Sequence, residues 1–158
     1  MSSRPGRRAR SRQASPSGLF QLLLEKNKMD ILNSFATDEK LETEGKVFPL
    51  SKTASIKVAR SGNPKYVSLL RQKMSEAQLD LVGGDEADQL AESILIDVMA
   101  ETILVGWKGI VEGGLEVPYS VSKAKEYLKV KDFRRKVASL SENFEAFKLK
   151  AEVDQKNV

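Results

Sequence analysis

The chain has 158 residues, about the size of one ordinary domain, and it contains neither cysteine nor histidine. These absences exclude disulfides, thiolate or imidazole zinc sites, a cysteine nucleophile and a Ser-His-Asp triad. The composition is 41% hydrophobic and 30% charged, close to the norm for globular proteins. No stretch approaches the roughly 18 apolar residues of a membrane span, so we expect no membrane association.

The net charge of +4 is distributed unevenly. Residues 1–18 contain no acid and carry a charge of +5, which leaves −1 for the rest of the chain. The five arginines of this basic tail are Arg4, Arg7, Arg8, Arg10 and Arg12. Ser, Arg, Pro and Gly cannot bury enough apolar surface to offset their ordering entropy, so we predict that the tail is disordered.

Several interpretations of the basic tail stay open. Its arginines could contact phosphates, or the segment could be an organelle transit peptide, which is also rich in Arg and Ser. A start codon placed upstream of a true start at Met29 would explain it too. A solvated extension without function is the interpretation we favour.

The first part of the body combines a short helix with extended segments. Apolar residues within 19–35 suggest a short helix, whereas the polar residues 36–45 suggest a loop. Residues 46–50 and 54–60 read as two short strands, since Ile56 and Val58 alternate with polar neighbours. They predict a small hairpin that must pack on helices to be stable.

The rest of the chain reads as helices. Asn63 is a good N-cap for a helix that begins at Pro64, and Asp85 can cap a core helix over residues 86–105. Glycines at 106, 109, 113 and 114 then mark turns. Ser120 is a candidate cap for a short helix over residues 121–129.

The last predicted helix would be capped by Asp132 and carries one apolar stripe. The stripe consists of Phe133, Val137, Leu140, Phe144 and Phe147. The sequence therefore predicts a mainly α protein, a small helical domain with a short N-terminal β-hairpin. We expect one domain over residues 19–152, and a frayed C-terminus over residues 153–158.

The sequence shows no constellation that points to catalysis or to a cofactor. Its glycines follow neither a P-loop nor a dinucleotide-binding pattern. The acids of the segment 85–92 lack the alternation and central glycine of a calcium loop, and acids in a first helical turn complement the helix dipole. We therefore predict a protein that is not an enzyme and has no cofactor or metal.

Charged residues form two blocks of opposite sign. Residues 76–101 contain eight acids and no base, and residues 123–136 contain seven bases against two acids. We favour two solvated faces that attract each other within the fold. The alternative is docking between copies or with a partner, where charge sets orientation and association rate.

Three segments together resemble the tail assembly chaperones of long-tailed phages and prophages. They are the strand-to-helix block Ala54–Tyr66, the pair of blocks Ile103–Ile110 and Val117–Ser120, and the segment Asn143–Phe147. The order and spacing carry the resemblance, which covers about residues 46–150. The basic tail lies outside the usual pattern.

The resemblance implies a non-catalytic protein of the bacterial host cytoplasm that leaves before the tail is complete. It would bind the tape measure protein, keep it soluble and promote polymerisation of the tail tube protein around it. Self-association would suit such work. Candidate residues for partner contact are Trp107, Phe144 and Phe147.

Such chaperones often have a longer product made by ribosomal frameshifting. Gln155-Lys156-Asn157 can be encoded by CAA AAA AAC, which contains a slippery heptamer, so we expect slippage there. The alternative function is a nucleic-acid-associated adaptor that uses the arginines of the basic tail. Beyond that tail, nucleic acid is not an expected partner.

Overall fold

The computed structural model describes residues 28–77 and 84–150, which form two compact units that divide after Ala36. The first unit contains helix α3 (Ile31–Ser34). Asp30 caps α3, because its carboxylate accepts a hydrogen bond from the backbone N–H of Asn33. α3 lies within the segment 19–35 that was expected to form a short helix. The basic tail, residues 19–27 of that segment and the predicted slippery codons lie outside the described residues, and the predicted domain 19–152 crosses the division.

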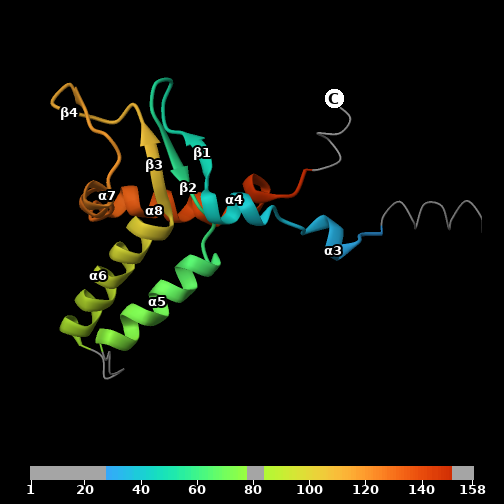
Figure 1. Cartoon of the computed structure of the whole chain (residues 1–158), viewed down its shortest axis with the longest axis horizontal. Coiled ribbons are helices and arrows are strands. Elements are labelled where there is room, and N and C mark those ends of the chain that lie inside the picture. Colours follow the sequence, from blue (N-terminus) through green and yellow to red (C-terminus); the bar gives the residue numbers. More distant parts are fainter. Residues whose placement is uncertain (1–27, 78–83, 151–158) are drawn as a thin grey trace, which may run out of the picture. The chain divides into compact units, whose positions relative to one another are not determined.

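The second unit is mainly helical, with a few short antiparallel strands (Figure 1). Its elements in chain order are α4 (Glu39–Glu44), β1 (Lys46–Pro49), β2 (Ser55–Val58), α5 (Pro64–Ala77), α6 (Asp85–Thr102), β3 (Leu104–Lys108), β4 (Val111–Glu112), β5 (Leu115–Glu116), α7 (Val121–Leu128), α8 (Lys131–Ser141) and α9 (Phe144–Phe147). The mainly α prediction therefore holds. The segment expected to be a loop at 36–45 instead contains α4, capped by the Asp38 carboxylate.

The expected hairpin of β1 and β2 is only part of a three-stranded sheet with the order β1-β2-β3. The prediction that one helix continues through residue 105 was wrong, since α6 ends at Thr102 and the chain enters β3 at once. β2 therefore becomes the central strand, with Ile56 opposite Trp107. Ile56 and Val58 are fully buried on the face of the sheet that the helices cover.

Helices α6, α7 and α8 build the core together with the inner face of the sheet. α6 packs against α7 and β3, while α7 packs against α8 and α8 against β2. The largest fully buried side chains are Phe147, Ile56, Ile103, Leu104, Leu128, Val58, Val98 and Val137. The acidic first half of α6 extends beyond this core, beside α5 (Figure 1).

Two of the predicted caps are present and two are not. Asn63 accepts from the backbone N–H of Tyr66, and Ser120 accepts from that of Lys123. Asp132 does not cap the last long helix, because α8 already begins at Lys131. Asp85 is the first residue of α6, after an N-cap at Gly84 that makes no side-chain hydrogen bond.

The predicted apolar stripe of the last helix is divided between two helices. α8 ends at Ser141, whose hydroxyl donates to the carbonyl oxygen of Ala138, and α9 begins only at Phe144. This break lets Phe147 turn into the core, where its ring lies 6.3 Å from that of Phe48.

Gly109, directly after β3, is held where only glycine fits. Its φ of +75° is in the left-handed region, and an added Cβ would overlap with the carbonyl oxygen of Thr53 in the turn between β1 and β2. Gly113 also has a positive φ, of +56°, but nothing lies within 4 Å of its would-be Cβ. Substituting each glycine in turn therefore distinguishes the cost of backbone strain, present at both positions, from the cost of steric overlap, present only at Gly109.

We expect Gly109→Ala to lower the free energy of unfolding by about 3 kcal/mol, from left-handed strain of about 1 kcal/mol and overpacking of about 2 kcal/mol. Gly113→Ala should cost only the strain, about 1 kcal/mol. Urea unfolding followed by circular dichroism measures both values. Equal losses for the two variants would show that the turn at Thr53 does not press on Gly109.

Candidate functional site

An apolar groove of about 310 Å³ lies where β3 and the turn after β1 meet α7 and α8. Its lining is almost entirely apolar. The lining residues are Leu50, Ile56, Trp107, Ile110, Val111, Glu112, Tyr127, Val130 and Phe133. Val111 and Val130 are more than half exposed, so the groove has an accessible apolar rim.

Trp107 lines the apolar groove and belongs to an aromatic cluster. Its ring centroid lies 4.8 Å from that of Tyr119 and 5.3 Å from that of Tyr127, which in turn lies 6.4 Å from Phe133. The indole N–H donates to the carbonyl oxygen of Val117 at 2.8 Å. Since this polar atom is already satisfied, Trp107 presents only apolar surface to the groove.

One edge of the groove is fixed by the β4–β5 hairpin through Glu112. Its carboxylate accepts hydrogen bonds from the ammonium of Lys123, at 3.0 and 3.1 Å, and from the Tyr127 hydroxyl at 2.8 Å. Lys123 also pairs with Glu126 at 2.9 Å. We call Glu112, Lys123 and Tyr127 the carboxylate clasp, because they join the hairpin to α7.

The carboxylate clasp perturbs the titration of its members. Hydrogen bonds from Lys123 and then from Tyr127 hold the pKa of Glu112 below its usual range. Bonds to Glu126 and to Glu112 raise the pKa of Lys123. Burial and the bond to Glu112 raise the pKa of Tyr127. All three groups thus keep their charge state across the neutral range, and the clasp is a structural bond rather than an acid–base pair.

The three residues predicted to contact a partner do not meet at one surface. Trp107 lines the groove but is only 9% exposed, and Phe147 is fully buried. Phe147 lies under Arg60, whose guanidinium carbon is 5.5 Å from the ring centroid. Phe144 is half-buried at the start of α9, and neither phenylalanine lines the groove. Their role in partner binding stays a prediction.

Most of the groove was not identified from the sequence. Val111 and Val130 stand in short segments with no periodic pattern, and Ile110 follows a glycine that reads as a turn. The only signal was that these apolar residues occur in connecting segments, where polar residues are the norm. Their convergence depends on β3, which the sequence did not reveal.

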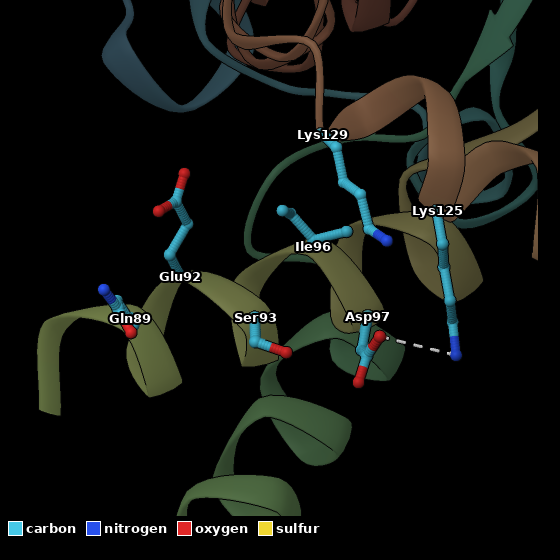
Figure 2. A pocket seen from close by; sticks show the side chains of 7 residues that line it. All are labelled: Gln89, Glu92, Ser93, Ile96, Asp97, Lys125 and Lys129. Carbon is cyan, nitrogen blue, oxygen red and sulfur yellow. Dashed lines mark ion pairs between the residues drawn. The ribbon is translucent and has the colours of Figure 1, made fainter. Parts of the chain in front are cut away.

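A second, polar pocket of about 410 Å³ lies between α6 and α7, as Figure 2 shows. The side chains that line it are Gln89, Glu92, Ser93, Ile96 and Asp97 of α6, Lys125 of α7 and Lys129, the C-cap of α7. Lys125 pairs with Asp97 at 3.4 Å. Glu92 pairs with Arg134 of α8 at 2.6 Å. The acidic and basic blocks of the sequence therefore do attract each other within the fold here, as we favoured.

A match to a family model covers residues 61–157, described as YdaY prophage protein. The chain belongs to the YdaY prophage protein family. The matched segment runs from just before α5 to beyond α9, and it includes Trp107, Tyr127 and Phe133 of the groove. No curated protein matches the chain, and no solved structure matches it.

These findings support the prophage origin that the resemblance implied. No helix in the described parts of the chain is long and apolar enough to cross a membrane. Among the same residues, no group of acids could hold a metal ion. The groove therefore offers apolar contact and a fixed shape, with its one carboxylate already engaged in the clasp.

We expect Lys123→Met to raise the pKa of Glu112 toward its ordinary value, and Tyr127→Phe to raise it less. Because the folded pKa is lowered, the clasp stabilises the protein above the unfolded pKa and this contribution is lost as pH falls through the folded value. Carbon-detected NMR titration of the Glu112 carboxyl measures both shifts. Lys136→Met, an exposed lysine of α8 outside the clasp, should leave the titration unchanged.

Proposed function

We propose that this family member is a non-catalytic tail assembly chaperone that binds the tape measure protein of its own prophage. The apolar groove is the observation that carries the proposal. Its volume is at the lower end for small-molecule sites, roughly 300–1,000 Å³, and it lacks the convergent polar groups by which such sites orient a ligand. An apolar helix face needs no such groups.

The groove suits an amphipathic helix for a physical reason. Helix-in-groove recognition inserts apolar side chains spaced three or four residues apart into an apolar cleft. Val111 and Val130 rim the cleft on the hairpin side and the helix side, and Leu50 adds an apolar residue that is 38% exposed. If the groove covers the exposed apolar helix faces of a long helical protein, it keeps that protein from aggregating.

The wider role follows from the same proposal. A chaperone that releases its client as tail tube protein polymerises would act in the cytoplasm of the bacterial host and be absent from the finished virion. The proposal includes no catalytic residue, cofactor or metal. It also includes the frameshifted longer product, which the codons for Gln155-Lys156-Asn157 would support.

The test is co-expression with the tape measure protein encoded in the same prophage. We expect Val130→Asp, and more strongly Val130→Asp with Val111→Asp, to reduce the co-purified tape measure protein at least tenfold and to return it to the insoluble fraction. The reason is that a charge on the rim must be desolvated when a helix docks.

Val47→Asp is the matched control for this experiment. Val47 is 58% exposed, as is Val130, but it belongs to β1 and does not line the groove. It should leave co-purification unchanged. Failure of the wild-type chain to bind or solubilise the tape measure protein would overturn the proposal.

The alternative function, a nucleic-acid adaptor, is favoured only by the five arginines of residues 1–18. It predicts binding to DNA or RNA that weakens steeply with salt and is lost when residues 1–18 are removed. The chaperone proposal predicts that the shortened chain binds the tape measure protein as the full chain does. Filter binding and co-purification of both forms decide between them.

A further inference from the structure

The hairpin formed by α5 and α6 has too little buried surface to stand alone. α5 has 14 residues, none of which is buried, and no residue of α6 before Ile94 is buried either. At the base of the hairpin the Asn63 side chain donates to the carbonyl oxygen of Thr102 at 3.4 Å. Figure 1 shows the two helices side by side, extending away from the sheet.

An apolar stripe on α5 is left uncovered. Val67, Leu70 and Met74 follow one another at steps of three and four residues, so they share one side of the helix. Val67 is 41% exposed and Met74 is 40% exposed. A 14-residue helix is marginal in water by itself, so its stability depends on what packs against it.

The charges of the hairpin are largely separated by helix, since α5 carries three bases and one acid, Glu76, whose carboxylate accepts a hydrogen bond from Gln72. α5 carries Lys65, Arg71 and Lys73, and the first turn of α6 carries Asp85, Glu86 and Asp88. Among the described residues, none of these six side chains has an oppositely charged partner within 4.0 Å. Glu92 and Asp97, further along α6, are paired with α8 and α7. The outer part of the hairpin thus holds unused charges of both signs.

We propose that this hairpin is a self-association surface, which pairs with the same hairpin of a second copy in antiparallel orientation. Two-fold symmetry requires a surface that is complementary to itself, and a basic helix beside an acidic one meets that requirement. A partner of a single charge sign would match only one of the two helices. The product would be a four-helix bundle.

The helical rise supports the antiparallel register. At 1.5 Å per residue, α5 is about 21 Å long, with Lys65 near the base of the hairpin and Ala77 at its far end. Turning the second copy end to end brings its Asp85 and Glu86, at the far end, beside Lys65. The same register sets Val67 against Met74 of the second copy and brings Leu70 within one residue of its own equivalent.

Sedimentation velocity of the full chain tests the proposal. We expect a concentration-dependent dimer that weakens between about 0.05 and 0.5 M salt, because the exposed charges are then screened. Lys65→Glu together with Arg71→Glu should weaken dimerisation at least tenfold. Asp85→Lys together with Glu86→Lys should do the same. Circular dichroism checks that each variant remains folded.

Mixing the two double variants provides the decisive measurement. In the mixed pair each α5 again faces an α6 of opposite charge, so a heterodimer should form although neither variant dimerises alone. Arg135→Glu with Lys136→Glu is the control, since it reverses the same number of charges on α8 and should leave the dimer intact. A wild-type chain that stays monomeric, or a mixture that fails to pair, overturns the proposal.

The hairpin surface is separate from the apolar groove proposed to bind the tape measure protein. Val130→Asp should leave the dimer intact, whereas the charge variants of the hairpin should still co-purify the tape measure protein. Failure of one proposal would therefore leave the other standing.

Discussion

The junction between α6 and β3 is the constraint on which the second unit depends. The chain changes from helix to strand without a loop, so the carbonyl groups around this junction need partners from elsewhere. The Tyr119 hydroxyl donates to the carbonyl oxygen of Leu104 at 2.8 Å and lies 3.1 Å from that of Ala100. The backbone N–H of Ala59, just after β2, donates to the carbonyl oxygen of Ile103 at 2.8 Å. Burial, together with the charge of Glu101, raises the pKa of Tyr119, so this hydroxyl keeps its proton.

The apolar groove is a consequence of that junction. Because β3 starts at Leu104, its register with β2 sets Trp107 opposite Ile56. The ring of Trp107 then lies 5.3 Å from that of Tyr127 in α7. The indole N–H then holds the Val117 carbonyl oxygen, in the segment that leads to α7, and the clasp at Glu112 holds the intervening hairpin. The shape of the groove therefore comes from the strand pairing, the indole hydrogen bond and the clasp, which also hold the fold together.

Sequence patterns predicted several features that depend on neighbouring residues, although they missed the locally capped helix α4. Caps such as Asn63 and Ser120 act through the next turn of helix, and they are present as expected. β3 was missed because its residues continue the apolar pattern of α6, and only pairing with β2 makes them a strand. Phe147 was interpreted as part of the apolar stripe of one long helix and as a candidate for partner contact. Its full burial was not predicted, since this depends on Phe48, 99 positions earlier in the chain. Non-local contacts also created the groove, so the sequence could offer only Trp107 as a member.

The division of charge, visible in the sequence, has two different structural outcomes along α6. Where α6 lies beside α7 and α8, Asp97 and Glu92 are paired with Lys125 and Arg134, and the opposite charges neutralise one another within the fold. Beyond that contact, the acids in the first turn of α6 have no ion-pair partner among the described residues, and the helix dipole complements them. The dipole accounts for acids at a helix start, but it does not account for the bases and the open apolar stripe on the adjacent α5. A surface that combines an apolar stripe and bases on one helix with acids at the start of the adjacent helix has the distribution by which interfaces fix orientation. Packing geometry thus decides whether the same block of acids acts within one chain or between two.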